Sequence, residues 1–191
     1  MPGLKFRVLL DSEKKEEVFR DILISDTADF ETFYKIILDS FNFKGDQIGS
    51  FYVSNDMWDK GHEISLMDMT YDDDSIDEPS TVMKSAIIKD FLEEPDQKFI
   101  LVYDFLCMWI FLVELIGFDK TEPKKPSVLL SIGQAPAENS REDITKDLFS
   151  DQRLEGGLDD DDDDDDDELG FNEFDDDYSD DDLSEFSEYD H

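Results

Sequence analysis

The sequence predicts an α+β domain in which an antiparallel sheet is covered by one main amphipathic helix, with a disordered acidic tail after it. Strand-length apolar runs recur along residues 1–135, and one segment among them carries an apolar stripe at helical spacing. Residues 151–191 instead hold 22 acidic residues against one basic residue, a density that favours a disordered chain. We therefore expect a domain over residues 1–135, a short helical segment over 136–150 and a tail over 151–191.

The first two predicted strands lie near the amino terminus. Residues 5–10 alternate so that Phe6, Val8 and Leu10 share one face. A short polar run separates them from residues 18–24, which are rich in β-branched and aromatic side chains. This arrangement predicts that the two strands pair.

The clearest local pattern is a helical stripe. Its apolar members fall at i, i+3, i+4, i+7, i+8 and i+11: Phe30, Phe33, Tyr34, Ile37, Leu38 and Phe41. We expect Asp26 or Thr27 to cap the amino terminus of this helix and Lys44-Gly45 to end it. The stripe should pack on a sheet.

The middle of the chain is predicted to hold short elements and loops. Residues 49–54 form a strand, and residues 55–61 form a polar turn that carries Trp58. Residues 67–80 are acidic and aperiodic, which predicts a loop. Residues 87–92 are expected to form a helical turn.

Two long apolar runs, residues 99–105 and 109–118, are predicted strands. Their link, residues 106–108, has no turn residue, so the runs form either a hairpin or one strand with a bulge. Both faces of the second run are apolar, so a central strand covered on both sides is expected. Residues 128–132 form a last strand, and a capping box at 140–143 opens a brief helix.

The formal charge of −36 narrows the possible partners. It disfavours direct nucleic-acid binding, which depends on Lys and Arg neutralising phosphates, and docking on anionic membranes. Asp104 and Glu114 interrupt the most hydrophobic stretch, residues 99–116, so no membrane span is expected. A single cysteine, Cys107, and no signal-peptide pattern favour a reducing, cytoplasmic location. Such a charge allows basic partners, bound cations or simply a role in solubility, and a basic protein is the partner that we expect.

Motifs for enzymatic chemistry are missing from the sequence. It has no Gly-rich phosphate loop, no G-x-S-x-G and no H-E-x-x-H. One internal histidine, His62, cannot make a metal site by itself. We expect neither a metal nor a cofactor, and a non-enzymatic role is favoured over an enzyme.

One stretch resembles a known family. Tyr103-Asp104-Phe105, followed by Trp109, resembles the Tyr-Asp-Phe-Gly-Asp-x-Trp signature of the plasmid pRi ORF-three-like family. Members of that family occur on plasmids and as passengers of insertion elements, some under the label TnpR. Residues 19–22, the predicted helix, residues 51–53 and residues 126–139 resemble further family segments in the same order, so the resemblance covers residues 4–145.

The resemblance implies an α+β domain and an association with mobile elements, but no established activity. Leu106 and Cys107 stand where the family has Gly-Asp, and Pro136-Ala137-Glu138-Asn139 replaces Pro-Pro-Glu-Asp. If the family Gly makes a turn or the Asp a polar site, this chain lacks both.

Tyr103, Asp104 and Trp109 form the first candidate site. In a ligand-binding or active site, Asp104 would be a carboxylate whose pKa is raised by its apolar surroundings. The alternative is that Asp104 accepts backbone N–H groups and fixes the hairpin. No second carboxylate or histidine falls in the same strand register, which favours this alternative.

The acidic tail supplies the second set of candidates. Aromatic residues are interleaved with its acids: Phe171, Phe174, Tyr178, Phe186 and Tyr189. Such a segment can simply keep the chain solvated, or it can bind a basic partner that has an apolar groove. The leading hypothesis is a non-enzymatic interaction protein whose tail binds a basic partner. The alternative is an enzyme or small-ligand protein with its site around Tyr103, Asp104 and Trp109.

Overall fold

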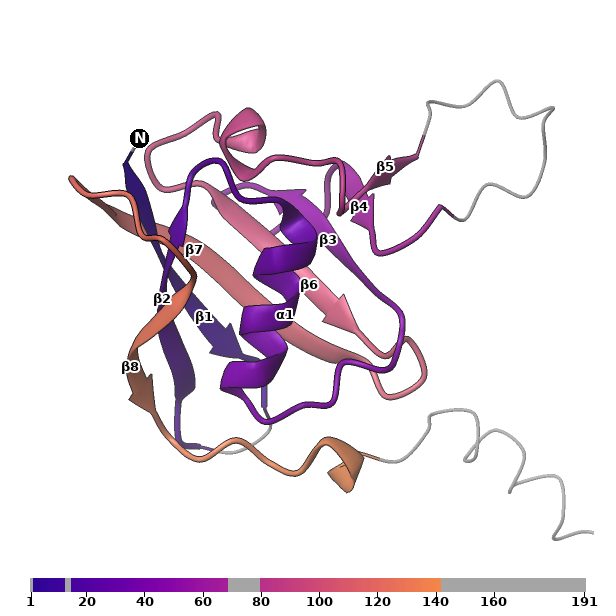
Figure 1. Cartoon of the computed structure of the whole chain (residues 1–191). Helices are drawn as coiled ribbons and strands as arrows, with labels where there is room; N and C mark the ends of the chain where they lie inside the picture. Colours follow the sequence, from indigo (N-terminus) through magenta and orange to yellow (C-terminus); the bar gives the residue numbers. More distant parts are fainter. Residues whose placement is uncertain (1, 13–14, 69–79, 142–191) are drawn as a thin grey trace, which may run out of the picture. The chain divides into compact units, whose positions relative to one another are not determined.

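Within residues 2–12, 15–68 and 80–141, which the computed structural model describes, the chain forms one eight-stranded sheet and one α-helix (Figure 1). The strands follow the order β5-β4-β3-β6-β7-β1-β2-β8. Their bounds are β1 Gly3–Leu10, β2 Val18–Ser25, β3 Gly49–Ser54, β4 Glu63–Ser65, β5 Thr81–Val82, β6 Lys98–Tyr103, β7 Trp109–Asp119 and β8 Ser127–Ile132. The helix α1 spans Phe30–Ser40, and two 3-10 turns span Ile88–Phe91 (η1) and Glu138–Ser140 (η2).

The predicted α+β class is confirmed. Neighbouring strands of the sheet run antiparallel except for β4 and β5, which are parallel. No helix in the described ranges is long and apolar enough to cross a membrane.

The pairing of the two amino-terminal strands is also confirmed. β1 and β2 pair along their whole length, with Phe6 opposite Ile22 and Val8 opposite Arg20. Phe6, Val8 and Leu10 are buried on the side of the sheet that α1 covers. They share this side because successive strand residues point to opposite faces. We call the opposite side, which carries Arg7 and Leu9, the far face.

The apolar stripe of α1 packs on the sheet as predicted. Its buried members are Phe30, Phe33, Tyr34, Ile37 and Leu38. Phe33 lies 4.8 Å from the Phe6 ring on β1 and stacks on Phe51 of β3 at 5.7 Å, measured between ring centroids. Figure 1 shows α1 lying across one face of the sheet. Aromatic contacts of this kind add to the hydrophobic burial that holds helix and sheet together.

The ends of α1 differ from the prediction. Asp29, not Asp26 or Thr27, is the N-cap, and its carboxylate accepts the Thr32 N–H at 2.7 Å. An N-cap side chain accepts the N–H of the second or third helical residue, and only the position next to the helix lies within reach of these groups.

The helix also ends before Lys44-Gly45. Its last residue is Ser40, and Asn42 takes a left-handed conformation with φ of 61°. The Phe43 N–H then donates to the Leu38 carbonyl at 2.9 Å, which satisfies an end carbonyl of the helix. Asn42 therefore plays the part that the sequence interpretation gave to the glycine.

Residues 104–108 form a hairpin turn between β6 and β7, which settles the choice between a hairpin and a bulge. β7 is central, between β6 and β1, but the expectation that it is covered on both sides is wrong. Its far-face residues Ile110, Leu112 and Glu114 are only half-buried, because α1 lies on the other side of the sheet. The strand buried at every position is β6.

Several shorter predictions have mixed outcomes. The helical turn at residues 87–92 is confirmed as η1. The strands β4 and β5 were not predicted, because they are too short to show a repeating pattern. The predicted loop at 67–80 falls mostly on residues 69–79, outside the described residues. The helix predicted after residue 140 and the acidic tail also lie outside them, since the description ends at Arg141.

Arg20 links three elements at one corner of the domain. Its side chain is 5% exposed and points to the α1 side of β2. The guanidinium donates to the carbonyl of Ser40 at the end of α1, at 2.9 Å, and to the carbonyl of Ile132 at the end of β8, at 2.8 Å. A cation at a helix carboxyl terminus also complements the helix dipole.

Candidate functional site

Tyr103 and Trp109 face each other at the turn end of β6 and β7 and are buried on the α1 side. The Tyr103 hydroxyl donates to Glu138 Oε1 at 2.6 Å, and the Trp109 indole N–H donates to the Glu138 carbonyl at 3.2 Å. The Arg141 guanidinium lies 4.2 Å from the centre of the Trp109 ring. These contacts attach the segment after β8 to the sheet.

Electrostatics at Tyr103 follow from this geometry. Burial raises the pKa of the Tyr103 phenol above its usual value, and the hydrogen bond to Glu138 raises it further because a phenolate would face a carboxylate. Burial likewise raises the pKa of the neighbouring Tyr34 phenol, which donates to the Gln47 carbonyl at 2.9 Å. Both phenols therefore act as neutral hydrogen-bond donors.

Asp104 lies apart from the two rings, in the hairpin turn. Its φ is 56°, and its carboxylate accepts the N–H groups of Leu106 at 3.1 Å and Cys107 at 3.3 Å. An aspartate that accepts backbone N–H groups in its own turn is a common device for fixing a tight turn. The structure thus brings Tyr103 and Trp109 together and places Asp104 in the connection between them. A ligand site at these three residues stays a prediction.

The five tail residues proposed as partner contacts, namely Phe171, Phe174, Tyr178, Phe186 and Tyr189, lie outside the described residues. Their role also stays a prediction. In the ranges that the structure does describe, no three His, Cys, Asp or Glu side chains lie close enough to hold a metal ion.

A row of alternating charges crosses the far face of the sheet. Lys98 of β6 lies opposite Glu114 of β7, Glu114 opposite Arg7 of β1, and Arg7 opposite Asp21 of β2. Arg7 binds Asp21 with two hydrogen bonds of 2.8 and 2.9 Å. The bond to Asp21 raises the pKa of Arg7, so this cation is firmly neutralised. We call these four residues the charged row.

A second row, next to the first, is apolar. Its members, taken from β6 to β8, are Ile100, Leu112, Leu9, Phe19 and Ile132. Ile100 is buried and Ile132 is 42% exposed, so the apolar row opens to solvent toward β8. The far face therefore combines a charged strip with an apolar strip, as protein-binding surfaces commonly do.

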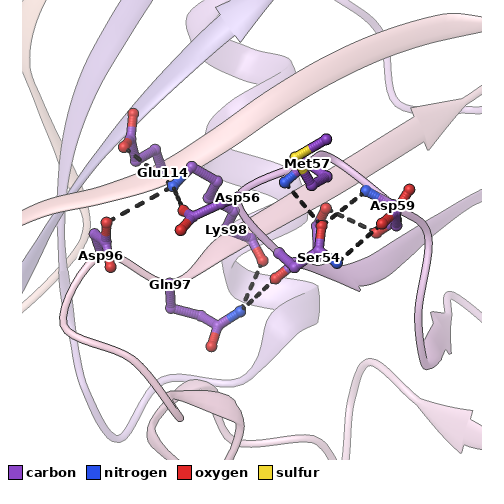
Figure 2. A network of polar contacts seen from close by, with 9 residues as sticks. Ser54, Asp56, Met57, Asp59, Asp96, Gln97, Lys98 and Glu114 are labelled. Carbon is purple, nitrogen blue, oxygen red and sulfur yellow. Dashed lines mark hydrogen bonds and ion pairs between the residues drawn. The ribbon is translucent and has the colours of Figure 1, made fainter.

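Lys98 is the centre of an acidic cluster at the β6 end of the charged row. Figure 2 shows its amine among the carboxylates of Asp56, Asp96 and Glu114. The distances from Nζ are 2.7 Å to Asp56, 3.8 Å to Asp96 and 3.6 Å to Glu114. The hydrogen bond to Asp56 is the main cause that raises the pKa of Lys98. Three carboxylates around one ammonium leave the cluster net negative.

Trp58 projects from the β3–β4 connection toward the same cluster. Its φ is 59°, a conformation that costs energy for a residue other than glycine. Asn55 holds the turn: its carbonyl accepts the Trp58 N–H at 3.0 Å, and its side chain accepts the Asp59 N–H at 3.1 Å. The Trp58 ring centre lies 5.9 Å from Lys98 Nζ.

A hollow of about 220 Å³ lies beside Trp58 on the far face. It is lined by Arg7, Leu9, Glu17, Phe19, Trp58, Leu112 and Glu114. We call it the Trp58 hollow. Its walls are aromatic and aliphatic and its charged members include two carboxylates, a combination that suits a cationic group with an apolar stem.

Sequence reasoning did not find this surface. Its signal exists in the strand alternation, which puts Arg7 and Leu9 on one face of β1 and Phe19 and Asp21 on one face of β2. Knowing that the charges meet requires the register of four strands, and pairing registers between strands far apart in the sequence are not readable from local patterns.

Comparison with known proteins supports the family resemblance. A model of the family described as plasmid pRiA4b ORF-3-like protein matches residues 2–183, which extends the similarity beyond residue 145 into the acidic tail. No curated protein matches the chain.

The fold is also found in a solved structure. The chain is similar to a protein of unknown function from Methanosarcina mazei Go1, with a TM-score of 0.59 and 18% sequence identity over 81% of this chain and 83% of that one. At this level of identity the similarity shows the fold alone.

Proposed function

The chain belongs to the plasmid pRiA4b ORF-3-like protein family, and we propose that it is a non-enzymatic interaction protein whose partner is a basic protein. Residues 1–150 carry 31 acidic and 16 basic residues, and residues 151–191 add 22 acids and one base. A charge of one sign steers a partner of the opposite sign and selects against like-charged ones.

The observation that carries the proposal is the internal use of the domain's cations. Arg7 is paired with Asp21, and Lys98 is surrounded by three carboxylates. Arg20 and Arg141 donate to backbone carbonyls and lie against the Phe41 and Trp109 rings. Because these four cations are engaged within the fold, the remaining bases offset only part of the charge of the 31 acids of residues 1–150. A surface of this kind suits a basic partner and repels phosphate backbones.

The acidic tail would add both charge and apolar anchors. Five aromatic residues interleaved with acids are more than solvation requires, and aromatic side chains dominate the affinity of many interfaces. The proposal therefore assigns the tail aromatics direct contact with the partner.

The test uses the full chain with a fluorescent peptide of alternating Lys and Leu residues, measured by anisotropy at low and at physiological salt. We expect saturable binding that weakens as salt rises but persists, because apolar contacts are not screened. A variant of the full chain replaces the five tail aromatics by Ser at constant charge, namely Phe171, Phe174, Tyr178, Phe186 and Tyr189. This variant should bind the Lys and Leu peptide with roughly tenfold lower affinity. Equal binding of an alternating Glu and Leu peptide would contradict the proposed function.

A further inference from the structure

We infer that the Trp58 hollow is the receptor for one basic side chain, an arginine or a lysine, of a partner protein. The inference rests on the proposed function, which makes the partner basic, and adds the place and the chemistry of recognition. The hollow measures about 220 Å³, smaller than the roughly 300–1,000 Å³ of small-molecule pockets. It accordingly suits a single side chain that is presented by a larger partner.

The walls of the hollow fit the stem of such a side chain. Leu9 and Leu112 form an aliphatic floor from two adjacent strands, and Phe19 and Trp58 add aromatic surface. Lysine and arginine bury their methylene stems on apolar surface while the charged head stays at a polar rim. Aromatic faces also attract the head itself.

The rim supplies carboxylates with unused capacity. Glu17 is exposed, and the Glu114 side chain is 41% exposed. Among the described residues neither carboxylate accepts a hydrogen bond, and the nearest cation to Glu114 is Lys98 at 3.6 Å. Two carboxylates at the mouth of an apolar hollow can therefore accept the donors of an incoming guanidinium or ammonium group.

Arg7, the one cation in the lining, does not exclude a basic side chain from the hollow. Its guanidinium is bound by Asp21 through two hydrogen bonds and lies 4.5 Å from the centre of the Phe19 ring. Arg7 is an internal example of the proposed recognition, a guanidinium held between an aromatic ring and a carboxylate. The incoming side chain would use the other members of the lining, Trp58, Glu17 and Glu114. Trp58 and Glu114 also lie near Lys98 Nζ, at 5.9 and 3.6 Å.

Trp58 is held ready for this contact. The turn around it keeps the residue in a left-handed conformation by way of Asn55 and Ser54, whose hydroxyl donates to the Asp59 carbonyl at 2.8 Å. Figure 2 shows this turn beside the Lys98 cluster. Backbone strain that a hydrogen-bonded turn maintains is often found at binding sites. A rigid aromatic anchor loses little entropy when a partner binds.

The test follows the two indole N–H resonances of the full chain by NMR. Trp58 reports on the hollow, and the buried Trp109 is an internal control. N-acetyl-arginine amide and N-acetyl-lysine amide are the probes, and the citrulline analogue, neutral but similar in shape, is the matched control. We expect the Trp58 signal to shift with the two cations and to stay in place with citrulline, while Trp109 is unmoved. A Trp58 resonance that ignores both cations would overturn the inference.

Variants separate this inference from the proposed function. The double substitution Glu17→Gln with Glu114→Gln should weaken binding of the Lys and Leu peptide by roughly fivefold, as should Trp58→Leu, whereas Trp58→Phe should retain most of the affinity. Asp39→Asn removes one acid on the opposite, α1 side and should leave affinity unchanged. If the peptide binds and only the hollow variants have no effect, the proposed function stands and the hollow is not the receptor. If no basic peptide binds at all, both fail.

Discussion

Single residues hold the carboxyl-terminal end of the described domain in place. Tyr103 and Trp109 both contact Glu138, and Glu138 Oε2 also accepts the Lys44 N–H at 2.8 Å. One carboxylate thus joins β6, the segment after α1 and the segment after β8. The segment that resembles the family signature lies here, and its Tyr103 and Trp109 have a structural role.

We predict a loss of stability in alkali that depends on Tyr103. In the folded state the pKa of the phenol is raised, whereas in the unfolded chain it is near 10. Above pH 10 the unfolded chain releases this proton and the folded chain keeps it, so stability is complete below pH 10 and falls as pH rises further. Urea unfolding between pH 9 and pH 11.5 measures the slope.

Tyr103→Phe is the matched variant for that prediction. It keeps the ring and removes the ionisable group, so its free energy of unfolding should fall less steeply above pH 10, although Tyr34 retains part of the slope. At pH 7 the variant should lose about 1–3 kcal/mol, because Glu138 loses a charge-assisted partner. Identical slopes for the two proteins would show that Tyr103 is accessible to ionisation in the fold.

At the scale of elements, the cap of α1 gives a direct test of the helix boundary. Asp29→Ala removes the acceptor of the Thr32 N–H and should lower the free energy of unfolding by about 1 kcal/mol. Thr27→Ala, at a position that the sequence also allowed as the cap, should stay within roughly 0.5 kcal/mol of the parent protein. Urea denaturation measures the free energy of unfolding of each variant. A larger loss in Thr27→Ala than in Asp29→Ala would mean that Thr27, not Asp29, caps α1.

How far the sequence predicts each element depends on how local its determinants are. The stripe of α1 and the alternation in β1 repeat over many residues, so the sequence predicts a helix and a strand there, and both are confirmed. The end of α1 depends on one residue, Asn42, whose left-handed conformation has no periodic signal. β4 and β5 have three and two residues, too few to show any period.

The candidate site is less predictable than the fold for the same reason. The hairpin that pairs Tyr103 with Trp109 is local, and it is one of the two connections that the sequence allows. Their partner Glu138 is joined to them only through the path of β8, and the charged row needs the combined register of four strands. Trp58 reaches the far face from a turn, where strand alternation gives no direction.

At the scale of the whole molecule, the acidic charge acts on stability as well as on binding. A chain with a formal charge of −36 repels itself in the compact state. Salt screens this long-range repulsion, whereas close and partly buried pairs such as Arg7–Asp21 are screened much less. Added salt should therefore raise the unfolding temperature of the full chain.

A variant at Lys98 tests whether repulsion between acids lowers the unfolding temperature. Its side chain is 11% exposed and faces three carboxylates, so Lys98→Met leaves Asp56, Asp96 and Glu114 without a cation between them. We expect the variant to unfold at a lower temperature than the parent at low salt and to recover more steeply as NaCl is added, because acid repulsion is then the larger part of its deficit. Lys35→Met, which removes an exposed cation paired with the single carboxylate of Glu31 on α1, is the matched control and should change little. Thermal unfolding followed by circular dichroism from low to high NaCl gives both slopes. Parallel slopes for the parent and Lys98→Met would mean that the three carboxylates do not repel one another, and the far face would then lack the negative potential that a basic partner needs.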